Sequence, residues 1–384
     1  MSLKKRKPTV KGESVVALDL GSSSLKLCVG ALQGRTLLVQ RLTETPMPTN
    51  AFREGAILDP DAVYKTLRTT LTHAHAKVKR VYLTVGGPQT TARPIRLPRM
   101  TPEALQKSIQ YEATRYLPSA AEEHLIGFQI LLSNGEEQME TLLVAAPRST
   151  TDPLLDLVER VGLEPQVLEL QPFAALRTAQ AVHGDTLPFA YALVDFGSEH
   201  TQITVARNAT LVLTRYIPIA SGTLTAALKG YFNYTEEEAE QIKHHLNLEE
   251  LLHIGQPQEN PPLRLIQPIV DELIREIRRS LNYYQSQYQP QGGRGAIERL
   301  YLYGGGALMQ GVAAYFEQKL GIPSERLDPF ACDAIQSVGV HPDQLADAAR
   351  WVTVLGAALA PIEMAQPFAT PRSEETPHAE TVAA

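Results

Sequence analysis

One pattern of hydrophobic and polar positions occurs twice in the chain. Residues 15–42 read VVALDLGSSSLKLCVGALQGRTLLVQRL, and residues 191–218 read YALVDFGSEHTQITVARNATLVLTRYIP. In each stretch an apolar run ends at an aspartate, one residue and a glycine follow, and two further strand-like runs are separated by turn residues. Short runs bounded by Gly and Asn turns are typical of β-hairpins. The pattern therefore predicts two three-stranded antiparallel units, in two similar subdomains that face each other.

Three other stretches carry helical periods. Apolar residues recur every fourth position over 308–320, directly after the strand-like run LYLYG at 300–304. A longer stripe with the same period covers 265–281, and Thr101 with Pro102 forms a typical helix start before another apolar face. The long stripe could form a coiled-coil seam, but a helix packed on its own subdomain is favoured because the period ends too soon.

Composition and charge indicate a globular protein with more than one domain. Its 384 residues exceed the size at which one hydrophobic core usually stops growing, and 43% of them are apolar. The net charge of −6 argues against a general nucleic-acid binder. Cys28 and Cys332 are too few for a disulfide framework, so we expect reduced thiols in a cytosolic protein. No apolar run approaches the roughly 20 residues that a bilayer crossing requires.

The two ends of the chain are polar. The first residues, MSLKKRKPTVKG, lack an apolar stretch, so we do not expect a secretory signal. We expect 1–13 to form a disordered basic head, although its lysines could also be attracted to an anionic membrane surface. The proline-bearing segment 363–384 has no helical period and is expected to form a disordered tail.

The turn after each Asp-x-Gly motif has the composition of a phosphate-binding loop. Gly21 and the serines after it let the backbone curl, so that successive N–H groups can surround an anion. Serine hydroxyls add donors, and Lys26 adds a point charge suited to phosphate. An Asp-Gly pair can also simply initiate a turn, so neither loop is decisive alone. The candidate phosphate-contacting residues of the two loops are Gly21, Ser22, Ser23, Ser24, Lys26, Gly197, Ser198 and Thr201.

Asp19 and Asp195 lie at the ends of the first strands of the two units. A carboxylate beside phosphates repels them unless a divalent cation lies between. Mg²⁺ is usually held through one or two carboxylates, several retained waters and phosphate oxygens. Two aspartates on opposite walls of a cleft would supply those carboxylates, in part through water.

A third motif joins an apolar strand to a predicted helix through Gly304, Gly305 and Gly306. A glycine-rich turn that opens onto a helix N-terminus lets the backbone approach a nucleotide and directs the helix dipole at it. A loop in which glycine only permits the connection would have the same residues, so the motif is weak by itself.

Together, the two Asp-x-Gly hairpins and the late GGGA turn resemble the actin, Hsp70 and sugar-kinase superfamily. Within it, the chain resembles the PilM family of type IV pilus assembly proteins. That family shows a D-I-G-S-S-S-x-K loop, here DLGSSSLK, and a proline-ended helix with a glutamate, here IQYEATRYLPSAAEEH. It also shows a Gly-Leu-x-Pro turn, here GLEP, and a GGGA-x-x-x-G motif before a helix and DPF, here GGGALMQGVAAYFEQKLGIPSERLDPF. The resemblance covers nearly all of residues 14–360.

The resemblance implies an α/β fold of the actin-like type, in which a ribonuclease H-like unit is duplicated into two lobes around a nucleotide cleft. It predicts four subdomains: 1A (14–88 and 148–188), 1C (89–147), 2A (189–225 and 294–362) and a helical 2B (226–293).

Two further groups of residues are assigned by the resemblance. Glu240 and Lys243, in TEEEAEQIKHHL, match the actin-like helix that lines the ribose and adenine pocket. By spacing alone they would form an ordinary surface ion pair. Gln171 matches the residue that orients the attacking water in actin, with Glu169 two residues earlier. A glutamine before a helix is otherwise unremarkable.

The resemblance also implies a function. ATP and Mg²⁺ would be the cofactors, hydrolysis would be slow at most, and the nucleotide would hold the two lobes in a closed arrangement. The implied partner is a PilN-like inner-membrane protein, whose cytoplasmic N-terminal peptide would dock between 1A and 1C, together with other components of the pilus assembly platform. The chain would lie in the cytoplasm, at the inner face of the cytoplasmic membrane, held there through this partner and without bound nucleic acid.

Several alternatives stay open at this point. An FtsA-like division filament protein has the same fold, although such proteins usually end in an amphipathic membrane-binding helix, which the polar tail lacks. A sugar or acid kinase of the superfamily would need an aspartate base beside a sugar pocket, and no motif for one is found. The sequence leaves both homo-oligomer formation and hydrolysis undecided.

Overall fold

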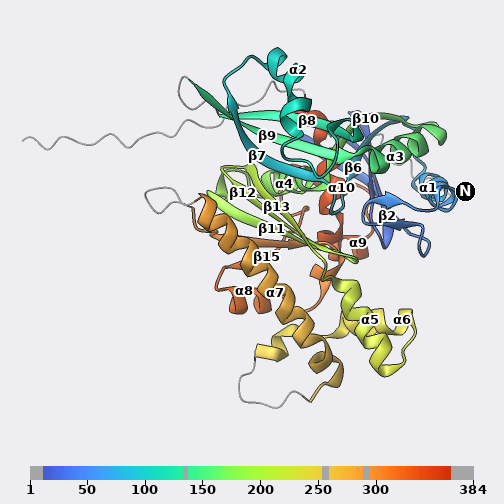
Figure 1. The fold of residues 1–384 in the computed structure, drawn as a ribbon. Helices are drawn as coiled ribbons and strands as arrows, with labels where there is room; N and C mark the ends of the chain where they lie inside the picture. Colours follow the sequence, from blue (N-terminus) through green and yellow to red (C-terminus); the bar gives the residue numbers. More distant parts are fainter. Residues whose placement is uncertain (1–11, 133–136, 253–258, 289–294, 365–384) are drawn as a thin grey trace, which may run out of the picture.

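The computed structural model describes residues 12–132, 137–252, 259–288 and 295–364. The chain forms an α/β fold with two lobes, each built on a mixed sheet (Figure 1). In the first sheet the strands follow the order β10 (Glu164–Leu170), β6 (Arg80–Val85), β1 (Glu13–Leu20), β2 (Ser24–Gln33), β3 (Thr36–Pro46) and β16 (Ile335–Ser337). In the second the order is β13 (Thr210–Ile217), β12 (Thr201–Arg207), β11 (Ala190–Phe196), β14 (Arg299–Tyr303) and β15 (Ser324–Arg326).

The two sheets repeat one topology. In each, the first strand pairs antiparallel with the second strand of its hairpin unit and parallel with a later strand on its other side, β1 with β6 and β11 with β14. Both three-stranded antiparallel units predicted from the sequence are present. Because β1 and β11 occupy equivalent positions in their sheets, Asp19 and Asp195 lie at equivalent places, near the ends of these two strands. The predicted duplicated actin-like architecture is confirmed at the level of the fold.

Helices cover the first sheet and connect it to the second. The elements here are α1 (Pro60–Ala74), α3 (Arg148–Arg160), α4 (Gln171–His183), α10 (Val352–Ala358), the short hairpin of β4 (Phe52–Arg53) and β5 (Ala56–Ile57), and the 3₁₀ turn η2 (Gly184–Thr186). The α4 and α10 backbones meet closely, because a Cβ at Gly356 would lie 1.8 Å from the Ala174 carbonyl oxygen. At its far end α4 reaches the second sheet, where the His183 and Tyr301 rings are 4.6 Å apart.

A separate three-stranded sheet stands beside the first lobe (Figure 1). It consists of β7 (Thr91–Pro98), β9 (Gln138–Pro147) and β8 (His124–Leu132), with α2 (Pro102–Ala113) and η1 (Ala121–Glu123). The Thr101 side chain accepts a hydrogen bond from the Ala104 N–H, so it caps α2 as predicted. Leu105 and Ile109 on α2 join a small core with this sheet. The elements fall within the range 89–147 that the sequence assigns to subdomain 1C.

The second lobe carries most of the remaining helices. These are α5 (Ser221–Phe232), α6 (Glu236–His245), η3 (Leu248–Leu252), α7 (Pro261–Tyr288) and α8 (Val312–Leu320). The apolar stripe of α7 packs on its own lobe, because Leu273, Ile277 and Leu281 are buried in one core with residues of β11, β12 and α8. This is the arrangement that the short period favoured over a coiled coil. No helix within the described ranges combines the length and apolar character that a bilayer crossing needs.

The C-terminal part of the described chain returns to the first lobe. After α9 (Pro342–Ala346) and η5 (Ala348–Trp351), α10 packs on α4 and β1, and β16 extends the first sheet at β3. The structure thus differs from the predicted 2A range, which extends to 362. All seven residues of α10 are buried, and the first lobe supplies the surface that covers them. The short α11 (Ala360–Met364) follows.

The predictions for the two ends fall almost entirely outside the described residues. Within the predicted head, only Gly12 and Glu13 are described, and Glu13 already begins β1. Within the predicted tail, only 363 and 364 are described, as the end of α11.

Candidate functional site

Asp19 lies where three elements of the first lobe converge. It is 6% exposed at the end of β1, and its Oδ1 accepts hydrogen bonds from Thr84 Oγ1 on β6 at 2.6 Å and from Gln171 Nε2 at 2.9 Å. Thr84 lies on β6, which pairs with β1, and Gln171 is the first residue of α4, directly after β10, which pairs with β6. These two hydrogen bonds fix the carboxylate orientation while leaving its second oxygen available.

Asp195 is the matching carboxylate of the second lobe. Burial, reinforced by the charge of Asp19, raises the pKa of Asp195 to about 7, while Lys26 acts in the opposite direction. Among the described residues, no side chain or backbone group donates a hydrogen bond to this carboxylate. Asp195 keeps some exposed surface, and a largely desolvated carboxylate that lies close to a second one and lacks donors is stabilised by a cation. The two Asp-x-Gly motifs, far apart in the sequence, are therefore close enough in space for their charges to interact.

The triple-glycine turn lies directly against the second Asp-x-Gly motif. Gly304 has φ +86°, and a Cβ there would be 2.2 Å from Asp195 Oδ1 and 3.0 Å from the Phe196 carbonyl oxygen. A Cβ at Gly306 would be 2.5 Å from the Phe196 ring, whereas nothing lies within 4 Å of one at Gly305. Only a chain without side chains at Gly304 and Gly306 can approach the motif this closely. The three motifs singled out from the sequence meet at one place.

The helix expected directly after these glycines begins later. Residues Gly305–Leu308 form a 3₁₀ turn (η4), and α8 starts only at Val312, after Gly311 in the left-handed conformation. A Cβ at Gly311 would meet Asn247 and the backbone of Glu249, so this second glycine also serves close packing. The expectation that the glycines open directly onto a helix N-terminus is therefore wrong, and the dipole of α8 does not start at the turn.

The first loop is a tight hairpin turn stabilised from within. The Gly21 N–H donates to the Ser24 carbonyl oxygen at 2.9 Å, so it closes the turn and is not free to meet an anion. Ser24 Oγ donates to Glu44 Oε1 at 2.6 Å, and Lys26 Nζ lies 3.9 Å from the same oxygen. Ser22 and Ser23 occupy the turn itself and keep exposed surface. Glu44, on the neighbouring strand β3, thus organises two of the residues predicted from the sequence.

The second loop holds the start of α5. The Gly197 carbonyl oxygen accepts from the Ser221 N–H at 2.9 Å, and the Ser198 carbonyl oxygen accepts from the Gly222 N–H at 3.0 Å. Thr201 is fully buried, and its hydroxyl donates to the Ile219 carbonyl oxygen at 2.7 Å. In this structure the Thr201 hydroxyl is engaged within the protein, which leaves Gly197 and Ser198 as the surface of the loop.

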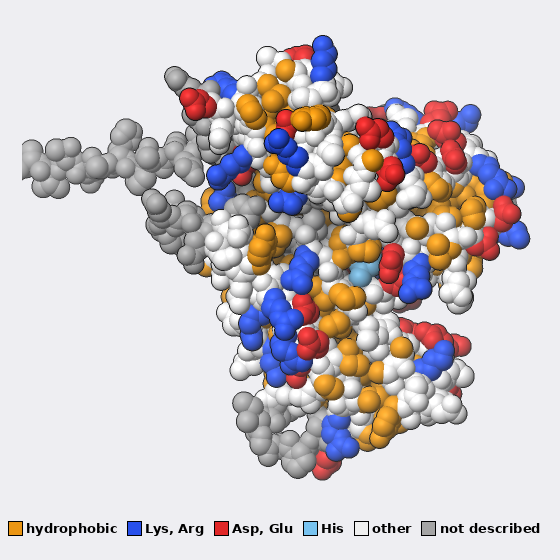
Figure 2. Space-filling view, viewed as in Figure 1, with side chains coloured by type: hydrophobic (Ala, Val, Ile, Leu, Met, Phe, Trp, Pro, Cys, Tyr) orange, Lys and Arg blue, Asp and Glu red, His pale blue; other side chains and the backbone are white. Residues whose placement is uncertain are grey.

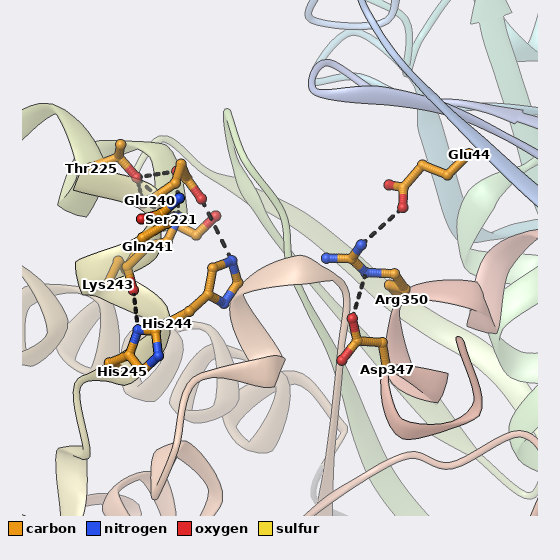
Figure 3. A network of polar contacts seen from close by, with 10 residues as sticks. All are labelled: Glu44, Ser221, Thr225, Glu240, Gln241, Lys243, His244, His245, Asp347 and Arg350. Carbon is orange, nitrogen blue, oxygen red and sulfur yellow. Dashed lines mark hydrogen bonds and ion pairs between the residues drawn. The ribbon is translucent and has the colours of Figure 1, made fainter. Parts of the chain in front are cut away.

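Glu240 and Lys243 form a network with α5 in which Lys243 is buried and Glu240 is partly exposed, and this distinguishes them from an ordinary surface pair (Figure 3). Lys243 is 3% exposed, and its Nζ donates to Glu240 Oε1 at 2.7 Å and to Thr225 Oγ1 at 2.9 Å. Burial lowers the pKa of Lys243, and Glu240 opposes this. Burial alone would raise the pKa of Glu240, but its hydrogen bonds from Lys243 and Thr225 hold it below the usual value.

A second charged group faces this network, and sequence reasoning missed it. Arg350 Nη1 donates to Glu44 Oε2 at 2.8 Å, and Asp347 lies 4.0 Å from Arg350 Nε (Figure 3). His244 is 3.7 Å from Glu240, and the charges of Arg350 and Asp347 both reach His244. Figure 2 shows a notch in the surface between the upper lobe and the α5–α6 part below it. No sequence pattern connects β3, α6 and η5, because only their folding brings them together.

The two residues proposed for water orientation lie in different surroundings. Glu169 forms a two-point ion pair with Arg177, with N–O distances of 2.7 and 2.8 Å, and is thereby occupied. Gln171 instead points to Asp19, and a Cβ at Gly86 would lie 1.9 Å from its Oε1. Gln171 is therefore the better placed of the two, next to the aspartate pair.

The carboxylate oxygens of the site fit a divalent cation that is held mainly by water and by oxygens of a bound nucleotide. Within the described part of the chain, no three His, Cys, Asp or Glu side chains are grouped as a complete metal site. Asp19 and Asp195 provide two carboxylates whose charges repel each other, and Lys26 offsets this only in part, since the pKa of Asp195 stays raised. Mg²⁺ takes one or two carboxylates and keeps several waters, which matches this sparse donor set.

A family model described as type IV pilus assembly protein PilM matches residues 17–361. The chain belongs to this family. A solved structure titled PilM-PilN type IV pilus biogenesis complex matches with a TM-score of 0.77 and 25% identity, over 92% of this chain and 99% of that chain. PilM-type proteins are actin-like, and the recognition made from the DLGSSSLK and GGGA motifs is confirmed.

Two more distant structures share the fold. The ethanolamine utilization protein EutJ of Carboxydothermus hydrogenoformans matches with a TM-score of 0.55 and 16% identity, over 93% of both chains. An MreB protein of Spiroplasma citri, solved with AMPPNP bound, matches with a TM-score of 0.53 and 12% identity, over 93% of this chain and 100% of that chain.

Curated relatives include cell division proteins named FtsA. The Bacillus subtilis protein is 26% identical over 260 residues, which are 61% of this chain and 58% of the relative. The Streptococcus pneumoniae protein is 22% identical over 288 residues, 68% of this chain and 59% of the relative. The chain thus spans less than two thirds of the length of these FtsA proteins.

Proposed function

We propose that this PilM family member binds Mg·ATP between its two lobes and acts as a nucleotide-regulated component of the type IV pilus assembly platform. Asp19 and Asp195 would hold the cation, in part through water, and the loops at Ser22–Ser23 and Ser198 would meet the phosphates. Glu240 and Lys243 would line the ribose and adenine side. The observation that carries the proposal is the convergence of the Asp19 and Asp195 carboxylates with the Gly304 turn, where Asp195 accepts no hydrogen bond from the described residues.

The bound nucleotide would bridge the lobes. Its phosphates would contact loops of both sheets, so binding energy would favour the closed arrangement over an open one. Gln171 would orient water near Asp19, and any hydrolysis would be slow because the described site offers no strong base to activate that water. The four subdomains 1A, 1C, 2A and 2B are the units that such a closure would move.

The partner we propose is a PilN-like inner-membrane protein that inserts its cytoplasmic N-terminal peptide between 1A and 1C. A hollow of about 770 Å³ lies at this junction, lined by Pro118, Ser119, Glu122, Glu123, His124 and Arg148 among others. The Arg148 Nε donates to the Glu122 carbonyl oxygen at 3.2 Å, which ties the start of α3 to η1 across the hollow. A concave junction of this kind suits a short peptide. The chain would then work in the cytoplasm, at the inner face of the membrane.

The nucleotide part is tested with Asp19→Ala. We expect Mg·ATP affinity, measured by calorimetry, to fall at least tenfold, while circular dichroism of the variant matches the parent. Asp61→Ala, at an exposed carboxylate on α1, is the matched control and should bind as the parent does. Equal affinity of Asp19→Ala and the parent would exclude the proposed cation site.

The partner part is tested separately. Ser119→Trp should fill the hollow and abolish capture of pilus inner-membrane components from native membranes, whereas Ser286→Trp, exposed on α7, should not. The capture is run with and without Mg·ATP. A difference in the captured amount between the two conditions would link partner binding to nucleotide binding. Recovery of division proteins in place of pilus components would instead favour an FtsA-like role. This second candidate is supported by the similarity of the chain to FtsA proteins.

A further inference from the structure

The first lobe has a strongly basic pole at the edge opposite the candidate site. The strands β1, β6 and β10 all begin there, at Glu13, Arg80 and Glu164, whereas Asp19 lies at the other end of β1. The helix α1 also ends at this edge, and the connection 75–79 leads from it into β6 (Figure 1).

The sequence of this pole is unusual in charge. The stretch 65–80, KTLRTTLTHAHAKVKR, contains five Lys and Arg residues and no Asp or Glu. Five of the chain's 36 Lys and Arg thus lie in one short stretch that contains none of its 42 Asp and Glu. The rest of the protein is correspondingly more acidic than the net charge of −6 indicates.

The pole presents these charges to solvent. All five Lys and Arg of 65–80 are exposed, and among the described residues no carboxylate pairs with four of them, Lys65, Arg68, Lys77 and Lys79. The fifth, Arg80, pairs with Glu13 at 3.2 Å and lies opposite Glu164 in the sheet register. Two carboxylates therefore share the edge, and the cations still outnumber them.

A shallow hollow lies among these cations. It has a volume of about 490 Å³ and is formed by the end of α1, the connection into β6 and the loop after α3. Arg68, Lys77 and Lys79 stand at its walls, and Leu71, Val78 and Leu163 contribute apolar surface. Cationic and apolar side chains that line one hollow match a phosphate head group with the first part of its lipid.

We propose that this basic pole, formed by Lys65, Arg68, Lys77, Lys79 and Arg80, docks on the anionic lipid surface of a membrane. An extended, planar, negatively charged surface can meet these cations at the same time. The acidic remainder of the molecule is repelled by that surface, so electrostatics also orient the protein with its pole toward the lipid. The proposal is independent of the nucleotide site and of any protein partner.

The magnitude follows from the charges involved. A Lys or Arg near an anionic leaflet contributes about 1 kcal/mol, which corresponds to about a fivefold change in partitioning. Such an attraction is screened within roughly 10 Å at moderate salt, so it must weaken as ionic strength rises. It is modest by itself and would act together with protein contacts at the membrane.

The test is sedimentation of the full chain with lipid vesicles that contain no protein. We expect salt-sensitive binding to vesicles of phosphatidylcholine mixed with phosphatidylglycerol, and none to phosphatidylcholine alone. Lys77→Gln combined with Lys79→Gln should weaken the binding by roughly 30-fold, because two charges are lost. The matched control, Lys107→Gln with Arg264→Gln, removes two exposed charges elsewhere and should bind as the parent does.

Several outcomes would overturn the proposal. Equal binding to neutral and anionic vesicles would show that charge does not drive the contact. Equal loss in both double variants would show that only the net charge matters, not the pole. Binding of a short DNA duplex that depends on Lys77 and Lys79, with no binding to anionic vesicles, would assign the pole to nucleic acid instead. Thermal unfolding of each variant confirms that it is folded.

Discussion

The close approach of the glycine turn to Asp195 gives the sharpest prediction. In Gly304→Ala, the new Cβ would lie 2.2 Å from Asp195 Oδ1, a separation that real Cβ contacts essentially never show. The neighbouring Gly305→Ala is the matched control, since nothing lies within 4 Å of its Cβ. The two variants add the same methyl group to adjacent residues of one turn, so a difference between them reports the local geometry.

The expected magnitude has two parts. Gly304 has φ +86° and ψ 176°, a region that is essentially restricted to glycine, and placing alanine there costs about 1–3 kcal/mol. Moving the turn or Asp195 to relieve the overlap costs about another 1–3 kcal/mol, as in other overpacked sites. We therefore expect Gly304→Ala to lower the free energy of unfolding by about 2–6 kcal/mol, and Gly305→Ala to change it by less than about 1 kcal/mol.

Urea unfolding followed by tryptophan fluorescence suits this measurement. Trp351 is the chain's single tryptophan and is 1% exposed in η5. The Gly304 N–H donates to the Ala349 carbonyl oxygen at 3.1 Å, so the probe lies close to the altered turn. Equal urea midpoints for the two variants would refute the close approach. A shifted Trp351 emission in folded Gly304→Ala alone would support a displaced turn.

Further predictions concern charges that are largely removed from solvent. The raised pKa of Asp195 means that ionising this carboxylate lowers the free energy of unfolding. This destabilisation is absent below about pH 4, grows between pH 4 and 7, and is complete above pH 7. Asp195→Asn should therefore be more stable than the parent at pH 8, on the order of 3–4 kcal/mol by urea unfolding, and equally stable at pH 4; a constant difference across pH would contradict this. Arg177→Met should destabilise the protein by about 3–5 kcal/mol, because it removes both hydrogen bonds that Arg177 donates to the largely buried Glu169 carboxylate. Arg160→Met, which breaks an exposed ion pair with Asp61, should cost less than about 1 kcal/mol in the same assay, and similar losses in both would argue against burial as the cause.

The sequence by itself determined the repeated hairpin units, the helix start at Thr101 and the apolar stripe of α7, because these follow from local periodicity and turn chemistry. It also located the aspartates and the triple glycine, since a buried strand that ends in Asp-x-Gly is a local signal. Where the helix after the glycines begins was not predictable in this way, because Gly311 takes its conformation from packing against Asn247.

Only the tertiary structure decided which residues surround these motifs. Thr84, Glu44 and Arg350 lie on strands and turns with no motif of their own, and they join the site because the sheet order and the returning C-terminal segment bring them there. The raised pKa of Asp195 and the burial of Lys243 likewise depend on neighbours distant in the chain. Hydrophobic periodicity specifies the elements, whereas desolvation and charge depend on distances in space, which no local pattern contains.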